Sequence, residues 1–288
     1  MISAQDWIAG GHRFAAPDGY SYFYRHDGIE NASTVVLFHG FPTWSYDWVN
    51  IASELSRDHQ VIAPDFLGYG ASDKPRARTY SVGSNADMIE GLLASIGVKN
   101  ARLVIHDYGA IVGQELLDRH RNGALSFGVD SVHLMNSGVV YDVYRPTFLQ
   151  RVLGNTIAGS LAVKLISKRG VRRGLDGVRG SMHPMSDQEF EETWHGMAID
   201  DGYRLAHVLV RYNWEREQHA QRWLDALTAY AGPLQLIWGL ADPVSGKHVL
   251  EALRPLVPNA RVDELDGVGH FPMCEAPNRV IDALRAAL

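Results

Sequence analysis

The chain has 288 residues, of which 46% are hydrophobic and 21% charged, a composition typical of a globular protein with a sizeable core. Its net charge of −6 offers no basic field for nucleic acid, and no run of about 18 apolar residues predicts a membrane span. The single cysteine, Cys274, excludes an internal disulfide. Since we expect no secretory signal in residues 1–13 either, we predict a cytoplasmic protein.

The first half of the chain alternates between strands and helices. An Asp18-Gly19 turn between residues 12–17 and 20–26 predicts a hairpin. The continuous apolar run 34–38 is typical of a strand that is buried on both faces. Further strands are predicted over 61–63, 103–105 and 132–135, and helices over 48–55, 88–96 and 109–119. This alternation predicts an α/β fold with a largely parallel sheet.

The pattern changes after Ser137. Residues 139–229 show helical segments (148–166, 187–197, 202–212 and 216–229) and no strand, with a glycine-rich basic loop at 167–180 that we interpret as solvated surface. Alternation then resumes, with strands over 234–238 and 260–265 and helices over 247–256 and 278–288. We therefore predict a core of residues 1–138 and 230–288, a helical cap of residues 139–229, and an apolar pocket between them.

Polar residues directly follow several predicted strands, at the sheet edge where open α/β folds bind ligands. They are His39, Asp65, His106, Asp107, Asn136, Asp242 and His270. In chain order, Asp107, Asp242 and His270 match the nucleophile, acid and histidine of an α/β-hydrolase. Structural interpretations stay open beside this one, with Asp107 as a helix cap, Asp242 as a turn residue and His270 as a core histidine.

These motifs resemble the aspartate-nucleophile branch of the α/β-hydrolases, which holds epoxide hydrolases and haloalkane dehalogenases. The resemblance rests on residues 39–42 (His-Gly-Phe-Pro), 65–75 and 105–109 (Ile-His-Asp-Tyr-Gly). Residues 39–48, 106–109 and 145–150 are more narrowly similar to the mesoderm-specific-transcript group. The resemblance implies an α/β-hydrolase fold, a cis Phe41-Pro42 bond and a catalytic triad of Asp107, Asp242 and His270. Ile105 departs from the pattern, since the family has a small residue there, and its bulk would shift Asp107.

The chemistry of an aspartate nucleophile supports the same assignment. A carboxylate is ionised at pH 7 and can attack an sp³ carbon, which gives an alkyl ester. His270 can then activate water to hydrolyse this ester, while Asp242 holds His270 in the right tautomer. The backbone N–H groups of Phe41 and Tyr108 are expected to form the oxyanion hole.

Two kinds of side chain separate the reactions of this branch. The family pattern of the dehalogenases holds the halide with an indole N–H directly after the nucleophile and a second donor in the oxyanion loop, where this chain has Tyr108 and Phe41. Epoxide hydrolases instead use cap tyrosines as the acid for the ring oxygen. Tyr212 is similarly placed, and Tyr144 is our choice for the second among three candidates, Tyr141, Tyr144 and Tyr203. Trp44 and His106, which belong to the quoted motifs, complete the predicted substrate-binding residues.

The predicted function is therefore hydrolysis of a small to medium apolar epoxide to a diol through a covalent alkyl-enzyme ester. The alternatives are a haloalkane dehalogenase or another hydrolase of this branch, a luciferase-like oxygenase, and a non-catalytic ligand-binding protein. We expect no metal and no cofactor, because no histidines pair at metal-ligand spacing and only one cysteine is present. The expected partner is a small apolar molecule and not nucleic acid, and the expected assembly is a monomer or homodimer.

Overall fold

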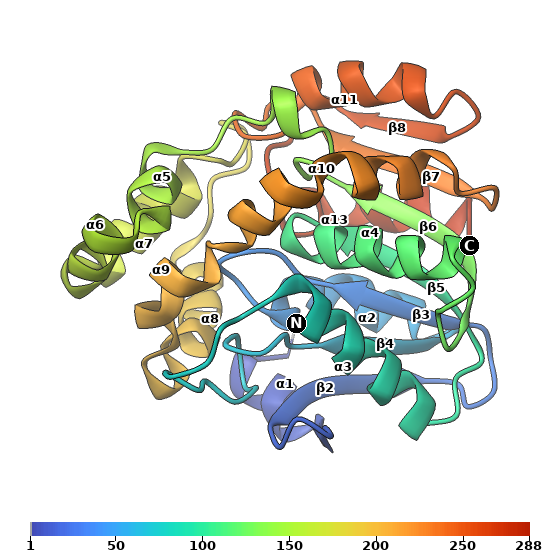
Figure 1. Cartoon of the computed structure of the whole chain (residues 1–288), viewed down its shortest axis with the longest axis horizontal. Helices are drawn as coiled ribbons and strands as arrows, with labels where there is room; N and C mark the ends of the chain where they lie inside the picture. Colours follow the sequence, from blue (N-terminus) through green and yellow to red (C-terminus); the bar gives the residue numbers. More distant parts are fainter. Residues whose placement is uncertain (1) are drawn as a thin grey trace.

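An eight-stranded sheet runs through the centre of the molecule (Figure 1). The computed structural model describes residues 2–288. The strands are β1 (His12–Ala15), β2 (Ser21–Gly28), β3 (Thr34–Phe38), β4 (Gln60–Pro64), β5 (Asn100–His106), β6 (Gly128–Met135), β7 (Leu234–Gly239) and β8 (Arg261–Leu265). Their order is β1-β2-β4-β3-β5-β6-β7-β8. The β1–β2 hairpin and the β2–β4 pair are antiparallel and the other pairs are parallel, which confirms the predicted hairpin and the largely parallel sheet.

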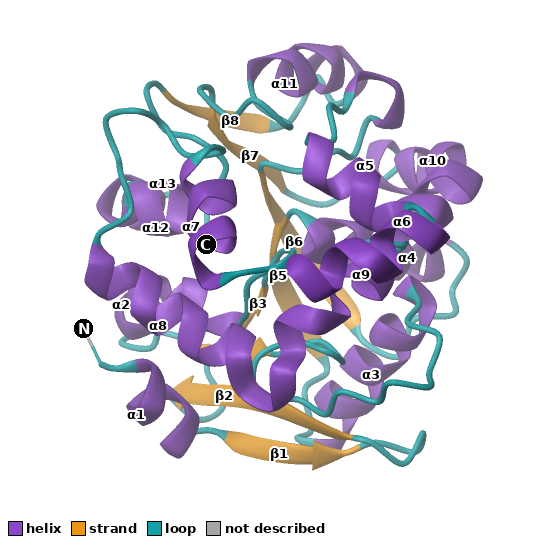
Figure 2. Cartoon of the chain, turned by 90° about the vertical axis from the view of Figure 1, so that its left-hand side faces the viewer, coloured by secondary structure: helices purple, strands orange, loops and turns teal. Residues whose placement is uncertain are grey.

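Helices cover both faces of the sheet, as Figure 2 shows with the sheet nearly edge-on. Those of the core are α1 (Ala4–Ala9), η1 (Ser45–Trp48), α2 (Val49–Leu55), α3 (Val82–Ser95), α4 (Tyr108–Arg121), α11 (Lys247–Leu253), η5 (Arg254–Leu256), α12 (Pro272–Glu275) and α13 (Pro277–Arg285), where η marks a 3-10 helix. The α3 and α4 helices lie on one face, and α2 and α13 on the other.

The strand β3 shows why the sheet needs both layers. All five of its residues are buried. Val36 and Phe38 pack into the hydrophobic cluster with α3 and α4, while Val35 and Leu37 pack into the cluster with α2 and α13. Because successive side chains of a strand point to opposite faces, a continuous apolar run fits a strand that is covered on both sides.

Residues 139–229 form helices and no strand, as predicted. They are η2 (Tyr141–Val143), α5 (Phe148–Gly154), α6 (Thr156–Ala162), η3 (Val163–Leu165), α7 (Lys168–Asp176), α8 (Asp187–Ala198), η4 (Ile199–Leu205), α9 (Ala206–Leu209) and α10 (Tyr212–Thr228). Most of them gather at the left end of the molecule in Figure 1, beyond the sheet. No helix within residues 2–288 has both the length and the hydropathy that a membrane crossing requires.

Three boundaries in this segment differ from the sequence prediction. The helix predicted over 202–212 ends at Leu209, and α10 begins at Tyr212 and not at 216. The single helix expected over 148–166 is broken at Asn155, whose side chain accepts hydrogen bonds from the backbone N–H groups of Ile157 and Ala158 and so starts a new helix. The basic stretch at 167–180 is not all loop, because its first half forms α7. There the Ser167 hydroxyl caps the helix by accepting from the Gly170 N–H.

The last helix of the predicted cap, α10, is attached to the core. It lies along α4, where Trp223 Nε1 donates to Glu115 Oε2 at 2.8 Å and Arg222 donates to Asp118 at 2.6 Å. The beginning of α10 reaches the sheet edge where the predicted site residues lie: Tyr212 packs on Tyr108, and Arg216 donates to the Gly138 carbonyl. The core therefore fixes the position of Tyr212.

Candidate active site

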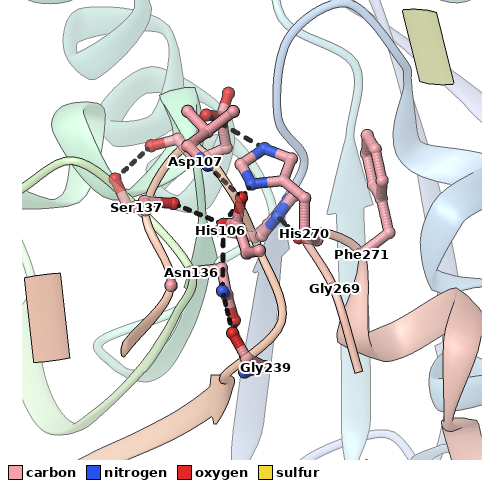
Figure 3. A network of polar contacts seen from close by, with 12 residues as sticks. His106, Asp107, Asn136, Ser137, Gly239, Gly269, His270 and Phe271 are labelled. Atoms are coloured by element: carbon pink, nitrogen blue, oxygen red, sulfur yellow. Dashed lines mark hydrogen bonds and ion pairs between the residues drawn. The ribbon is translucent and has the colours of Figure 1, made fainter. Parts of the chain in front are cut away.

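The turn between β5 and α4 carries Asp107 at the carboxyl edge of the sheet (Figure 3). Its backbone has φ 47° and ψ −114°, in the positive-φ range that non-glycine residues rarely adopt. The Ser137 hydroxyl donates to the Asp107 carbonyl at 2.8 Å, and the Asp107 N–H donates to the Asn136 carbonyl at 3.3 Å. Residues that follow β6 thus hold this strained turn in place.

Ile105 fits into this turn because a glycine faces it. Ile105 is fully buried, and a Cβ added to Gly113 in α4 would lie 2.8 Å from Ile105 Cδ1. Gly109 permits a second close approach, since its Cβ would lie 2.6 Å from the Phe38 carbonyl oxygen. The family pattern has a small residue at position 105. In this chain the small residue of the contact is Gly113, which leaves room for the Ile105 side chain.

Asp107, Asp242 and His270 come together at the ends of β5, β7 and β8. His270 Nδ1 donates to Asp242 Oδ2 at 2.8 Å, and His270 Nε2 lies 3.4 Å from Asp107 Oδ2. Figure 3 shows the imidazole ring of His270 directed at the Asp107 carboxylate. All three side chains are buried. This geometry allows an acid to orient the histidine while the histidine faces a carboxylate nucleophile.

The charges of these three groups stabilise one another. Burial by itself raises the pKa of Asp242, but the charge of His270 and hydrogen bonds lower that pKa to about 2. Burial likewise raises the pKa of Asp107, and the His270 contact outweighs it, so this pKa lies below its ordinary value. Burial lowers the pKa of His270, yet the two carboxylates raise it well above 6.5. The two carboxylates therefore favour the protonated form of His270 in the free site.

Several further groups hold Asp242, and sequence reasoning did not assign them a role. Asn136 Nδ2 donates to Asp242 Oδ2 at 3.0 Å, and the Ser245 hydroxyl donates to the same oxygen at 2.7 Å. The Val244 N–H donates to Asp242 Oδ1 at 2.7 Å. Asn136 had a signal in the sequence, because it directly follows β6. For Ser245 we find no such signal.

One of the two predicted oxyanion groups contacts the Asp107 carboxylate directly. The Phe41 N–H donates to Asp107 Oδ1 at 2.9 Å. The N–H of Tyr108 begins α4, in the first turn, where backbone donors lack partners within the helix. The Phe41-Pro42 bond is cis, which confirms the prediction. The Tyr108 hydroxyl accepts from Asn85 Nδ2 at 2.7 Å and is thereby held within the core.

A cavity of about 750 Å³ lies beside these groups, between the helices of residues 139–229 and the core. Its wall includes Phe41, Tyr69 and His270 from the core and Leu153, Ile166 and Leu209 from the inserted helices. Asp107 is not part of the wall, but its carboxylate lies directly behind two wall residues, since both Phe41 and His270 contact it. The predicted apolar pocket between insertion and core is confirmed.

Tyr212 and Tyr144 are not on the cavity wall, where we expected them to contact substrate. The ring of Tyr212 packs 4.8 Å from that of Tyr108 and 6.2 Å from that of Phe41. Both hydroxyl groups are buried, and neither finds a hydrogen-bond partner in the described part of the chain. Burial raises the pKa of Tyr212 well above its ordinary value, and the charge of Asp107 adds to the rise. Burial also raises the pKa of Tyr144, to about 12. Both are therefore protonated donors.

Tyr69 is a third such hydroxyl, which sequence reasoning missed. It is buried, has no hydrogen-bond partner within residues 2–288, and its ring stacks on Tyr108 at 6.0 Å. Unlike the other two tyrosines, it also lines the cavity. The signal was present, because Tyr69 belongs to the 65–75 loop, but only the tyrosines of the insertion were considered as donors.

Trp44 and His106 do not line the cavity, where we expected them to contact substrate. Trp44 is fully buried, with its ring stacked on Tyr46 and covered by Gly196 of α8. His106 is also fully buried, and its Nε2 bonds to the backbone carbonyl of His270 at 2.7 Å. Burial and the charge of His270 lower the pKa of His106 to about 4. His106 therefore supports the His270 loop as a neutral ring.

No group of three or more His, Cys, Asp or Glu side chains within residues 2–288 is arranged to hold a metal ion. At the sheet edge, the side chains of Asp107 and Asp242 both contact His270.

The chain belongs to the α/β-hydrolase fold family, whose model matches residues 33–277. It is 36% identical to the human mesoderm-specific transcript homolog protein over 288 aligned residues, which cover 96% of this chain and 85% of the human protein. This likeness agrees with the narrower group that residues 39–48, 106–109 and 145–150 indicated.

Solved structures establish the same fold. A loop variant of the haloalkane dehalogenase DbeA from Bradyrhizobium elkanii superposes with a TM-score of 0.80 at 22% identity, covering 96% of this chain and 95% of that one. The epoxide hydrolase CorEH superposes with a TM-score of 0.75 at 20% identity, covering 96% of this chain and 97% of that one. At such identities the likeness describes the fold and not the reaction.

Proposed function

We propose that this α/β-hydrolase converts an apolar epoxide to a diol, with Asp107 as nucleophile, His270 as base and Asp242 as the acid that orients it. The observation that carries the proposal is the buried Tyr212 hydroxyl, which has no hydrogen-bond partner in the described chain and whose ring packs against Tyr108 and Phe41, the two residues expected to form the oxyanion hole. A buried donor without a partner costs free energy, and a substrate oxygen would satisfy it.

The first step forms the ester. Asp107 Oδ2 attacks an epoxide carbon while the bond from that carbon to the ring oxygen breaks, and a tyrosine gives its proton to the leaving oxygen. The Phe41 N–H keeps its bond to Oδ1, which orients the other oxygen for attack. The apolar cavity beside the carboxylate provides the room for the rest of the substrate.

The second step releases the diol. Once Asp107 is an ester, its negative charge is gone and the pKa of His270 falls, so His270 gives its proton to the tyrosinate left by the first step. The neutral imidazole then takes a proton from water, the resulting hydroxide attacks the ester carbonyl carbon, and the Phe41 and Tyr108 N–H groups stabilise the oxyanion. The intermediate collapses to the diol and the Asp107 carboxylate, and His270 keeps the proton from water, which restores the free site.

Dehalogenation is the alternative reaction, and the donors it needs are missing from the expected positions. Phe41 offers no side-chain donor, and the Tyr108 hydroxyl is bonded to Asn85. The indole of Trp44 is stacked on Tyr46, outside the cavity wall. These contacts favour epoxide chemistry over halide release. A ligand-binding protein without turnover is the second alternative. The cytoplasmic location and the monomeric or dimeric state belong to the same proposal.

The test is a panel of epoxides and haloalkanes with the wild-type protein and Asp107→Ala in parallel. We expect diol from the wild type only and no halide from either protein. His270→Gln should then accumulate as a covalent adduct, whose intact mass is higher than that of the free protein by one epoxide. Peptide mapping should place this added mass on the peptide that contains Asp107. Halide release would replace the epoxide proposal with the dehalogenase one. If an epoxide raises the melting temperature but no product forms, the epoxide proposal would be replaced by that of a ligand-binding protein without turnover.

A further inference from the structure

Large apolar side chains are exposed on one stretch of the inserted helices. Ile157 is 75% exposed, Leu161 59% and Leu165 84%. They are four residues apart, so they share one side of α6 and η3. In α5, Phe148 is 81% exposed. Single exposed apolar residues are ordinary, but a contiguous group marks an interaction surface.

The same stretch is strongly basic. Residues 144–174 contain no Asp or Glu and seven cations, Arg145, Arg151, Lys164, Lys168, Arg169, Arg172 and Arg173, in a chain whose net charge is −6. Lys168 and Arg172 pair with carboxylates of α7 and α8. The other five cations form no ion pair within residues 2–288, so their charges are free to meet an anionic partner.

These side chains lie at one end of the molecule, and two of them line the cavity. Figure 1 shows α5, α6 and α7 at the left edge, and they face the viewer in Figure 2. The exposed Leu165 and the cation Arg173 both belong to the cavity wall. We call the exposed side chains of α5, α6, η3 and α7 the docking face.

We propose that the docking face binds the surface of an anionic lipid bilayer, from which the cavity receives an apolar substrate. Helices that insert apolar side chains at the headgroup level while Lys and Arg contact anionic lipids bind in this way without spanning the bilayer. Exposed Leu, Ile and Phe between the cations distinguish this face from a site for nucleic acid, which prefers polar and stacking side chains. Docking does not depend on the epoxide chemistry, because it can be measured without any substrate.

The experiment is co-sedimentation of the whole chain with vesicles of phosphatidylcholine alone or mixed with phosphatidylglycerol. We expect binding to the mixed vesicles, weak binding to phosphatidylcholine, and loss of binding at high salt. Lys164→Gln with Arg169→Gln should weaken binding by about fivefold for each cation neutralised. Ile157→Asp with Leu161→Asp should weaken it more than about tenfold, since both apolar contacts are lost and two anions added.

The matched control for the apolar variant is Ile29→Asp with Leu256→Asp. These side chains are 50% and 43% exposed, they add the same charge, and they lie after β2 and in η5, away from the docking face. Lys99→Gln with Lys247→Gln serves as the control for the cations. All substituted side chains are at the surface, and thermal unfolding checks that each variant folds.

Three outcomes would overturn the proposal. The first is equal sedimentation of the wild type with both kinds of vesicle or with neither. The second is an equal loss of binding in the control variants. The third is self-association of the wild type without vesicle binding, abolished by Ile157→Asp with Leu161→Asp, which would assign the face to a second copy of the chain. None of these outcomes bears on whether the epoxide panel yields a diol.

Discussion

The side-chain amide of Asn136 donates to Asp242 at 3.0 Å, on the same carboxylate oxygen that accepts from His270 at 2.8 Å. Asn136 follows β6 and Asp242 follows β7, and these strands are neighbours in the sheet. The ends of two neighbouring strands therefore supply the carboxylate that contacts His270 and the amide that holds this carboxylate. Asn136 is a positioning residue for the acid that orients His270.

This contact predicts that a carboxylate at position 136, after β6, can take over the role of the Asp242 carboxylate, which follows β7. Asp242→Ala should lower turnover by about 10³–10⁴-fold, because His270 loses its orienting carboxylate. Asn136→Asp in that background should recover at least about tenfold, since the new carboxylate lies beside the vacated position. Steady-state turnover of the best epoxide from the panel measures both. A double variant no faster than Asp242→Ala would show that position 136 cannot reach His270.

Tyr212→Phe should slow formation of the ester while leaving the fold intact. Loss of one of two acid groups should lower turnover by about tenfold to hundredfold, seen as slower adduct growth in the His270→Gln background. Because the Tyr212 hydroxyl is buried without a partner, its removal should leave stability unchanged or raise it by up to about 1 kcal/mol.

Tyr22→Phe is the matched control for that variant. The Tyr22 hydroxyl donates to Asp18 at 2.8 Å. Tyr22 belongs to β2 and is far in sequence from the residues of the site. Its loss should cost about 1 kcal/mol of stability and leave turnover unchanged. Equal turnover in Tyr212→Phe and wild type would remove Tyr212 from the mechanism.

The pKa of His270 should fall when Asp107 loses its charge. Both carboxylates raise this pKa well above 6.5, so Asp107→Asn leaves only Asp242 to raise it. An NMR titration of the His270 ring should show a lower midpoint in the variant than in the wild type. The proposed mechanism relies on the same fall in the alkyl-enzyme, where His270 acts as the base. An unchanged or higher midpoint would contradict the assigned contact.

The same pKa sets how stability depends on pH. A histidine with a raised pKa in the folded state stabilises the protein fully below about pH 6.5, and this contribution is lost as the pH rises through the folded-state pKa. Wild-type stability should therefore fall above neutral pH. In Asp107→Asn, the free energy of unfolding should fall less steeply as the pH rises. Urea unfolding across the same pH range measures this.

Ile105 and Gly113 should behave as a coupled pair. Gly113→Ala should destabilise the protein by about 1–3 kcal/mol, because its Cβ would lie 2.8 Å from Ile105 Cδ1. Ile105→Ala alone should cost about 2–5 kcal/mol through the cavity it leaves. The double variant should be more stable than the sum of the two by at least about 1 kcal/mol in urea unfolding. Simple additivity would mean that the methyl group is accommodated elsewhere.

Much of the fold could be predicted because its signals are local. The apolar run of β3 and the change from alternation to helices after Ser137 are visible within short windows, and both were confirmed. The predictions failed where a local signal was overridden by a neighbour. The glycines of 167–180 suggested a loop, but the Ser167 cap and the burial of Leu175 against the core make a helix of its first half.

The sequence by itself determined which residues meet at the site, because the carboxyl ends of parallel strands share one edge and Asp107, Asp242 and His270 each follow a strand. Only the tertiary structure decided what surrounds them. Three features depend on how separate elements pack against one another. They are the room that Gly113 leaves for Ile105, the hydrogen bond from Asn136 to Asp242, and the position of Trp44 outside the cavity wall. Side-chain contacts between elements follow from interlocking shapes across the core, and no spacing along the chain encodes them.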